Sequence, residues 1–299
     1  MIERLRHVTS TDGVALAVQE HGDPALPTIV AVHGYPDDHT VWDGVVRELG
    51  GRFHVVTYDV RGAGASQRPR GRSSYALPQL AADLGTVIDA VSPSAPVHLV
   101  AHDWGSIQCW EAVTDPGFAD RLASYTSISG PCLDHAAWWL RGVHRRPRAV
   151  ARQLLDSYYI ALFQLPWLPE AAARVGLVDR VVAHSGRVGR PAGAPTHAPS
   201  SLADILDGIQ LYRANFLARL LRPRKRHSDV PVQVLAPALD AHVDSQMQRE
   251  APRAWLTSLE THEIDGNHWV VEQAPDLIAR HLEGFVERLS SEATSTVGA

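Results

Sequence analysis

A short apolar run that turns directly into a helix around one acidic residue constrains the fold of this chain most. Residues 97–103, VHLVAHD, have the apolar character of a buried strand, and residues 104–113, WGSIQCWEAV, follow at once with the pattern of a helix. The junction reads AHDWG, in which the small residues Ala101 and Gly105 lie two positions before and two positions after Asp103. Small residues let the chain turn tightly from strand to helix and expose the central side chain above the sheet edge.

The acidic residue in this turn has two interpretations. Asp103 can be the N-cap of the following helix, which is a common role for Asp, or it can be a nucleophile that the turn exposes. The turn is imperfect, because Ala101 stands where glycine is usual. A carboxylate is already ionised at neutral pH, which a helix N-terminus favours, and it can displace a leaving group at a saturated carbon. The resulting alkyl–enzyme ester then needs a base to activate water and an oxyanion site.

The second half of the chain offers a base and an acid to orient it. Asp240 ends the apolar run VQVLAPALD (232–240), and His268 follows in IDGNHWVVEQAP. In this order Asp240 would hold the ring of His268, and His268 would deprotonate the hydrolytic water. Asp244 and Asp134 compete for the role of the acid, although neither ends a strand as directly.

A third segment can supply the oxyanion site. HGYP (33–36) ends the apolar run TIVAVHG, and we expect the backbone N–H groups of Tyr35 and Trp104 to form the oxyanion hole. The alternative is an ordinary turn, since glycine and proline both end strands. The glycine-rich segment DVRGAGAS (59–66) lacks the third glycine of a dinucleotide-binding fingerprint, so we interpret it as a turn. No HExxH or similar spacing is present, and the sequence predicts neither a metal nor a cofactor.

The wider pattern predicts an α/β fold, because apolar runs alternate with helical patterns as in a parallel sheet covered on both faces. The predicted strands are 28–34, 54–60, 97–103, 123–130 and 232–240, and the predicted helices are 77–91 and 104–113. The alternation stops after Gly130, where a segment rich in Trp, Arg and helix formers begins. We therefore divide the chain into a core in two parts (1–130 and 229–289), a helical cap (131–228) and a flexible tail or linker (290–299).

Composition excludes several other classes of protein. A formal net charge of −5 over 299 residues gives no electrostatic reason to expect a nucleic-acid partner. The first residues lack the apolar segment of a secretory signal, and no apolar run is long enough to span a membrane. Cys109 and Cys132 are the only cysteines, so neither a disulfide framework nor a cysteine zinc site is expected. These features indicate a soluble, cytoplasmic protein.

Five segments together resemble the epoxide hydrolase branch of the α/β-hydrolase superfamily. They are HGYPDD (33–38), DVRGAGAS (59–66), AHDWG (101–105), LDAHV (239–243) and GNHW (266–269). The resemblance implies an α/β-hydrolase fold with a mostly parallel central sheet, a helical cap inserted after the sixth strand, and substrate contacts from His33, Pro36, Phe163 and Trp269. The chain is also similar to the hydrolase half of bacterial proteins that fuse an epoxide hydrolase to a short-chain dehydrogenase, which implies a further C-terminal domain in a longer protein.

The resemblance also implies the reaction. Members of this branch convert an epoxide and water to a vicinal diol through an aspartyl ester, and two cap tyrosines assist the departing oxygen. YYIALFQLP (158–166) is similar to the first tyrosine motif and implies Tyr159 as donor, with Tyr158 as the alternative. IQLYRANF (209–216) is similar to the second and implies Tyr212 as its partner.

Two other functions share parts of this pattern. Haloalkane and fluoroacetate dehalogenases have the same core motifs, and they would need Trp104 and a second donor, such as Trp138, Trp139 or Trp167, to hold the halide. A catalytically idle hydrolase fold that binds a ligand belongs to another class. Such proteins commonly lose a member of the catalytic triad, whereas Asp103, Asp240 and His268 are all present.

The predicted cap is basic at both ends. The basic residues are Arg141, Arg145, Arg146, Arg148 and Arg152 at one end, and Arg219, Arg222, Arg224, Lys225 and Arg226 at the other. They are either a solvated face paired with the acidic core or a basic rim around an apolar opening. A rim would suit apolar or amphiphilic substrates such as epoxy fatty acids and would favour peripheral contact with an anionic membrane.

Overall fold

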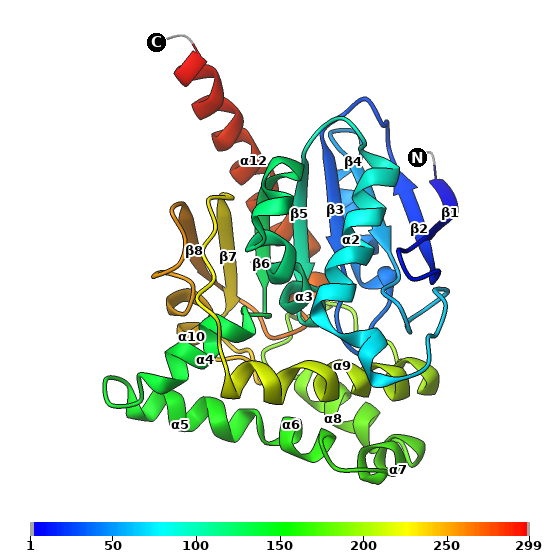
Figure 1. Cartoon of the computed structure of the whole chain (residues 1–299), viewed down its shortest axis with the longest axis vertical. Helices are drawn as coiled ribbons and strands as arrows, with labels where there is room; N and C mark the ends of the chain where they lie inside the picture. The colour runs from blue at the N-terminus through cyan, green and yellow to red at the C-terminus, as the bar shows by residue number, and fades with distance from the viewer. Residues whose placement is uncertain (1–2, 298–299) are drawn as a thin grey trace.

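A sheet of eight strands forms the centre of the molecule (Figure 1). The computed structural model describes residues 3–297. The strands are β1 (Glu3–Thr9), β2 (Ala15–His21), β3 (Thr28–Val32), β4 (His54–Tyr58), β5 (Val97–His102), β6 (Leu122–Ile128), β7 (Val232–Pro237) and β8 (Leu259–Ile264). Their order is β1-β2-β4-β3-β5-β6-β7-β8, in which β2 is antiparallel to β1 and to β4 and all other neighbours are parallel.

The predicted fold class, a mostly parallel sheet flanked by helices, is confirmed. Strands β3 to β7 lie where the apolar runs predict them, and every residue of β3 and β4 is buried because helices cover both faces of the sheet. Strands β1, β2 and β8 were not predicted. The edge strands β1 (ERLRHVT) and β8 (LETHEI) carry charged side chains, which suit a sheet edge but hide the strand from a search for apolar runs.

Six helices cover the core of the molecule. They are α1 (Asp43–Leu49), α2 (Leu77–Val91), α3 (Trp104–Val113), α10 (Ser245–Glu250), α11 (Val270–Gln273) and α12 (Pro275–Val297). Helices α2 and α3 have the predicted bounds, and they pack into one apolar cluster on the sheet. Helices α1, α11 and α12 pack into a second cluster with other residues of the same strands. Both faces of the sheet are thus buried under helices.

The cap lies between β6 and β7 and covers one end of the sheet (Figure 1). It consists of α4 (Leu133–Arg141), α5 (Pro147–Asp156), α6 (Tyr158–Phe163), α7 (Leu168–Arg174), α8 (Leu177–Ser185) and α9 (Leu202–Leu221). Its predicted position after the sixth strand is confirmed. The carboxyl ends of parallel strands share one edge of a sheet, so the residues that follow β3, β5 and β7 meet beneath the cap.

The end of the chain differs from the expected flexible tail. Residues 290–297 continue helix α12, which projects away from the sheet in Figure 1, and residues 298–299 lie outside the described range. The earlier part of α12 buries Ile278, Leu282 and Phe285. Extending a helix that already exists fixes one residue for each hydrogen bond gained, so a polar segment without apolar periodicity can continue it.

Candidate active site

Asp103 occupies the sharp turn between β5 and α3. Its backbone has φ 50° and ψ −122°, a conformation that costs a residue with a side chain roughly 1–3 kcal/mol. Two glycines make room for the turn. A Cβ on Gly105 would lie 2.3 Å from the carbonyl oxygen of Val32, and a Cβ on Gly34 would lie 2.5 Å from the Cβ of Asp103. The turn thereby holds the Asp103 carboxyl group at the wall of the cavity between core and cap.

The two oxygens of the Asp103 carboxylate have different neighbours. Oδ1 accepts a 2.8 Å hydrogen bond from the backbone N–H of Tyr35, in the loop after β3. Oδ2 lies 3.6 Å from Nε2 of His268. Trp104 is the first residue of α3, so its N–H is one of the amides at the helix start that have no partner within the helix. Tyr35 and Trp104 therefore flank Asp103 as the predicted oxyanion hole requires, and that role stays a prediction.

Asp240 and His268 lie together behind Asp103. Nδ1 of His268 is 3.1 and 3.2 Å from the two carboxylate oxygens of Asp240. Oδ1 of Asp240 accepts the backbone N–H groups of His242 and Val243, and Oδ2 accepts the side-chain amide of Gln248. These contacts fix the carboxylate in a loop that is otherwise irregular, and they leave Nε2 of His268 directed at Asp103.

The two competing acids have other partners. The Asp244 carboxylate caps helix α10 by accepting the N–H groups of Gln246 and Met247. Asp134 is buried and paired with Arg219 and Arg226, both at 2.8 Å or less. Neither acid contacts His268 within the described residues 3–297.

The electrostatics of the trio follow from burial and mutual attraction. Burial opposes charge on all three side chains, but the attraction between them is stronger. The carboxylates of Asp240 and Asp103 raise the pKa of His268 to about 10, and His268 in turn lowers the pKa of both acids. At neutral pH the resting site therefore contains an imidazolium between two carboxylates.

The cap tyrosines face this trio from helices α6 and α9. The rings of Tyr159 and Tyr212 lie 5.9 Å apart, and Tyr212 packs edge-on against Trp104 at 4.8 Å. Burial, followed by the negative charge of Asp103, raises the pKa of Tyr159, and burial raises that of Tyr212. Both hydroxyls therefore stay protonated. Tyr158, the alternative donor, is 60% exposed, and its ring stands perpendicular to that of Tyr159.

Two cavities, of about 290 and 370 Å³, adjoin each other at Asp103 and the cap tyrosines. Asp103, Tyr159, Tyr212 and His242 line both of them. The smaller cavity runs under α6, α7 and α8 and the larger one between α4, α5, α6 and α9, and apolar side chains form most of both walls. The site is thus an apolar passage with its polar groups at the middle.

Three of the four predicted substrate contacts line the smaller cavity, namely Pro36, Phe163 and Trp269. His33 lines neither cavity, and its contact with the substrate stays a prediction. Its Nδ1 donates to the Gly34 carbonyl oxygen, and its Nε2 accepts the N–H of Val60. Burial lowers the pKa of His33, and the neutral ring joins the loops after β3 and β4.

His242 was missed in the sequence analysis. Its ring lies 4.7 Å from the ring of His268 and 5.7 Å from that of Tyr159. Burial and the nearby charge of His268 lower the pKa of His242 to about 4, so it is a neutral wall of both cavities. Its position two residues after Asp240 was the available signal, because residues beside a catalytic acid share its loop.

A second missed group ties the cap loop to the core. His197, in the loop between α8 and α9, lies with Nε2 3.2 Å from Asp37 and with Nδ1 2.7 Å from Glu272. Its ring stacks on Trp269 at 4.0 Å. Burial raises the pKa of Asp37 to about 7, although His197 opposes the shift, and the two acids raise the pKa of His197 against the effect of its own burial. The bridge therefore joins the loop between α8 and α9 to the part of the core beside His268.

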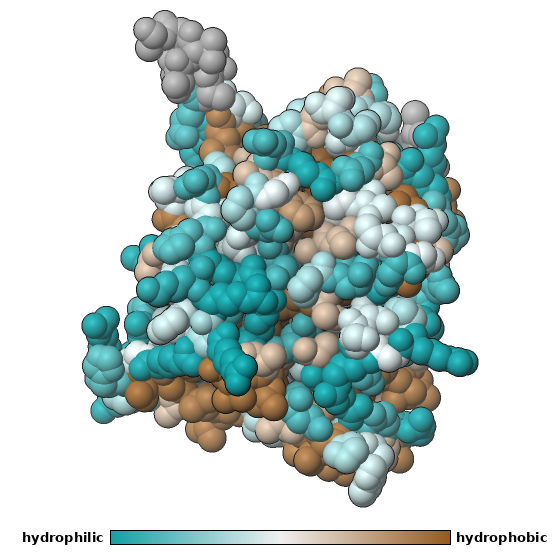
Figure 2. All heavy atoms as spheres, viewed as in Figure 1, coloured by the Kyte–Doolittle hydropathy of each residue, from teal (hydrophilic) through white to brown (hydrophobic). Residues whose placement is uncertain are grey.

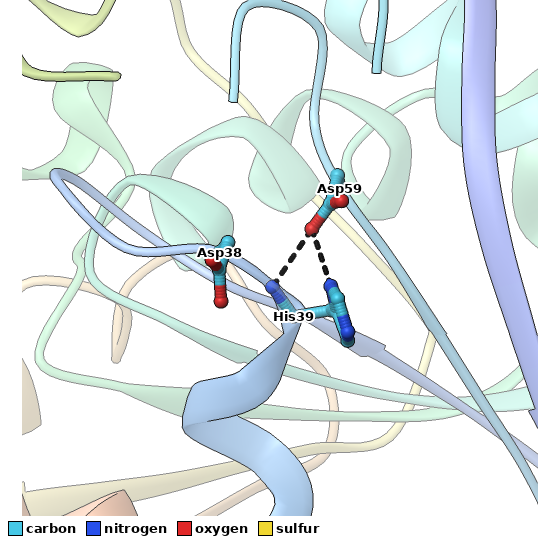
Figure 3. A group of neighbouring side chains, drawn as sticks. All are labelled: Asp38, His39 and Asp59. Atoms are coloured by element: carbon cyan, nitrogen blue, oxygen red, sulfur yellow. Dashed lines mark hydrogen bonds and ion pairs between the residues drawn. The ribbon is translucent and has the colours of Figure 1, made fainter. Parts of the chain in front are cut away.

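One cluster has the composition of a metal site but not its open geometry. Asp38, His39 and Asp59 bring potential ligand atoms together at the ends of β3 and β4 (Figure 3). Oδ1 of Asp59 already accepts the backbone N–H of His39 at 2.9 Å and lies 2.7 Å from its ring Nδ1 (Figure 3). Asp38 accepts the N–H of Thr40 and caps a short 3₁₀ helix. These contacts make the cluster a brace between two loops.

Comparisons with known proteins agree with this geometry. Over 293 residues the chain is 36% identical to the probable oxidoreductase EphD of Mycobacterium tuberculosis, in a match that covers 94% of this chain and 49% of that protein. It is 26% identical to epoxide hydrolase 3 of Mus musculus, over 93% of this chain and 76% of that protein. The crystal structure of a Bacillus megaterium epoxide hydrolase with an inhibitor superposes with a TM-score of 0.76 at 20% identity, covering 95% and 100% of the two chains.

The matches show which family the chain belongs to and how much of its relatives' length it covers. The chain spans about half the length of the first of these curated relatives. The resemblance to the epoxide hydrolase branch that the motifs predict is confirmed by the curated relatives. The solved structures, at 19 and 20% identity, share the fold. Because residues 27–275 match the alpha/beta hydrolase fold model and the sheet carries its acidic turn where that fold has its nucleophile, this chain belongs to the alpha/beta hydrolase fold family.

Proposed function

We propose that the chain is an epoxide hydrolase that converts an epoxide and water to a vicinal diol through an ester on Asp103. The observation that carries the proposal is that the Asp103 carboxylate, from the core, lines the same two cavities as Tyr159 and Tyr212, from the cap. A nucleophile and two O–H donors on opposite sides are what opening of a three-membered ether ring needs. The epoxide hydrolases among the relatives support the same reaction.

In the first step Oδ2 of Asp103 attacks one epoxide carbon. The C–O bond of the ring breaks, its electron pair stays on the oxygen, and a tyrosine hydroxyl supplies the proton to that oxygen. The raised pKa values of Tyr159 and Tyr212 keep both groups protonated until then. Oδ1, held by the Tyr35 N–H, becomes the ester carbonyl oxygen.

The second step depends on a change of charge that the first step makes. Esterification removes the negative charge of Asp103, one of the two charges that raise the pKa of His268. Burial of His268 then has less opposition and its pKa falls. His268 gives its proton to the tyrosinate that the first step left and can then act as a base toward water. Water attacks the ester carbonyl carbon and gives one proton to His268, while the N–H groups of Tyr35 and Trp104 stabilise the oxyanion. The bond between the carbonyl carbon and the ester oxygen then breaks, and the second proton of the water passes to the leaving alkoxide. The diol is released, and the Asp103 carboxylate and protonated His268 are restored.

The shape of the passage supports a substrate with an apolar group on each side of the epoxide. The cavities of about 290 and 370 Å³ extend in different directions from Asp103, and each can hold one substituent. A lipid epoxide with the ring inside its chain fits this arrangement, whereas a compact terminal epoxide would fill one cavity only. We infer that the substrates are apolar or amphiphilic epoxides.

The position of the indole groups argues against dehalogenation. Trp138 donates to the carbonyl oxygen of Arg224, Trp139 donates to Glu250, and Trp167 is 74% exposed. None of these three lines either cavity, so none of them can pair with Trp104 to hold a halide. A different observation disfavours an idle ligand-binding fold. The backbone of Asp103 is strained, and strain of this kind gathers at functional sites, where the surrounding structure maintains it.

A trapping experiment tests the proposed reaction. In His268→Gln attack by Asp103 survives while activation of water fails, so incubation with an epoxide should raise the intact mass by the full mass of the substrate. Asp103→Ala should give no label and no diol. With haloalkanes, the wild type should release no halide. Labelling of Asp103→Ala, or a mass gain smaller than the full mass of the epoxide, would contradict the proposal.

We also infer that the protein works in the cytoplasm. Cys109 and Cys132 are both buried and free, as is usual in a reducing compartment. Between residues 3 and 297, no helix has the length and apolar content needed to cross a membrane. Fractionation of cells that produce the protein, with antibody detection in each fraction, checks the compartment.

A further inference from the structure

The outer face of the cap exposes an unusual number of large apolar side chains. Leu155 of α5, Trp167 in the loop before α7 and Val175 after α7 are each more than 70% exposed. Other exposed residues on α5, α6 and α8 and in the loop before α7 are Leu154, Tyr158, Leu162, Leu165, Leu177 and Val181. Figure 2 shows hydrophobic residues gathered along this face, at the lower edge of the molecule beneath α5, α6 and α7. We name this surface the apolar cap face. Apolar surface gathered on one side of a protein marks an interaction site.

Both cavities open through the apolar cap face. The exposed residues Tyr158, Leu162 and Val181 line the smaller cavity. The exposed residues Leu154 and Tyr158 line the larger one. A molecule that reaches Asp103 therefore crosses this surface, and whatever covers the surface delivers the substrate.

The charge of the cap limits what can cover it. Residues 131–228 contain 15 Lys and Arg against 6 Asp and Glu, a formal charge of +9, while the whole chain has a charge of −5. None of the six cap acids is exposed, whereas Arg148, Arg152 and Arg174 are. On α5, Arg148, Arg152 and Leu155 follow the i, i+4, i+7 spacing of one helix face. Exposed cations beside exposed apolar groups are complementary to a partner whose outer layer is anionic and whose interior is apolar.

The structure changes the expectation of a basic rim at both ends of the cap. Arg219 and Arg226 are buried and share the carboxylates of Glu111 and Asp134. They join the cap to α3 and are unavailable to a ligand. Arg146 is paired with Glu250 at 2.7 Å. The exposed basic residues of the cap lie at the end of α4, in the loop before α5, on α5, α7 and α8, and in the loops after α8 and α9.

We propose that the apolar cap face binds peripherally to an anionic lipid surface, with its apolar side chains between the lipid chains and its arginines at the headgroups. Arg side chains suit this position because their methylene stems pack on apolar surface while the guanidinium stays in water. A second copy of the chain is a poorer occupant, since the exposed arginines of two cap faces would repel each other. Substrate then passes from the lipid into the cavities without crossing water.

Binding to vesicles tests this proposal without any turnover, so it can fail while the proposed reaction stands. Co-sedimentation with phosphatidylglycerol vesicles should be strong at low salt, weaker at high salt, and weak with phosphatidylcholine alone. Leu155→Ser/Trp167→Ser/Val175→Ser should lower the partition coefficient by about tenfold or more, because three apolar anchors are removed. None of these residues lines a cavity, so hydrolysis of a water-soluble epoxide should be unchanged.

Two matched controls lie on the core. Leu5 is 62% exposed on β1, and Leu5→Ser should bind vesicles as the wild type does. Arg148→Glu/Arg174→Glu should weaken binding and remove most of its salt dependence, whereas Arg4→Glu/Arg47→Glu, on the core surface, should not. Equal binding to neutral and anionic vesicles, or an unchanged partition of the triple variant, would overturn the proposal. So would a dimer in light scattering that the triple variant converts to a monomer.

Discussion

Replacing Asp240 with Asn would reveal how the acid controls His268, because every neighbour of this carboxylate donates a hydrogen bond to it. Oδ1 accepts the N–H groups of His242 and Val243 at 2.9 and 3.1 Å, and Oδ2 accepts the amide of Gln248 at 3.3 Å. The ring Nδ1 of His268 lies 3.1 Å from Oδ1 and 3.2 Å from Oδ2. In Asp240→Asn one oxygen becomes an NH₂ group, which donates and cannot accept in the plane of these partners.

The geometry predicts which of the two oxygens the amide nitrogen replaces. The two backbone donors hold the remaining oxygen at the Oδ1 position, so the NH₂ group meets Gln248 and His268 instead. His268 can remove the clash by carrying its proton on Nε2, which faces Asp103 and is then unable to accept a proton from water. An unpaired buried donor costs about 1–3 kcal/mol of stability. Loss of the tautomer-fixing acid in a Ser-His-Asp triad slows catalysis by roughly 10⁴-fold, and we expect ester hydrolysis here to slow on the order of 10³ to 10⁴-fold.

Attack by Asp103 needs no proton transfer to His268, so alkylation should slow by less than about tenfold. Single-turnover mixing with an epoxide, followed by acid quench and intact mass, separates the two steps. The ester should accumulate in Asp240→Asn and decay within the dead time in the wild type. Asp244→Asn is the matched control. Asp244 caps α10, and Asn is an N-cap of similar strength, so stability and both rates should change little. The reasoning fails if alkylation and hydrolysis slow equally, or if Asp134→Asn produces the defect.

Three further predictions concern the cap and the turn. Tyr159→Phe and Tyr212→Phe should each slow alkylation by roughly 10- to 100-fold and leave ester hydrolysis unchanged in rapid-quench assays; full epoxide turnover in the double variant would refute their role as proton donors. His197→Gln should lower the melting temperature most below about pH 6.5, because folding raises the pKa of His197. A group of this kind stabilises the fold fully below its unfolded pKa and loses that effect as the pH rises through its folded pKa. A difference in melting temperature that stays constant from mildly acidic to alkaline pH would contradict this. Gly34→Ala should destabilise the fold by about 1–3 kcal/mol in urea unfolding and abolish alkylation, because the added methyl group would lie 2.5 Å from the Cβ of Asp103; wild-type labelling by an epoxide would count against this close approach.

The local pattern of the sequence was enough to predict the catalytic frame. Residues 97–113 encode a strand, a turn and a helix by short-range rules, and α3 has the predicted bounds. Asp103, Asp240 and the loop of Tyr35 each follow a strand of the parallel sheet, so topology alone brings them to one edge. The distances of Asp103 and Asp240 to His268 agree with the predicted trio, although the roles of these residues in catalysis stay predictions.

The sequence did not predict which way side chains point where the cap meets the core, because that depends on packing between segments far apart in the chain. His33 lies in the motif that contains Tyr35, yet its ring turns away from the cavity to accept the N–H of Val60. Tyr158 and Tyr159 are adjacent on α6, and only the contact of this helix with α9 decides which of them is buried. Arg219 and Arg226 have the same residue type as the arginines of the cap surface. They are buried because Glu111, on α3, and Asp134, on α4, neutralise them across long stretches of the chain. Periodicity and motif spacing describe neighbours along the chain, whereas these orientations are set by partners that only the folded structure brings together.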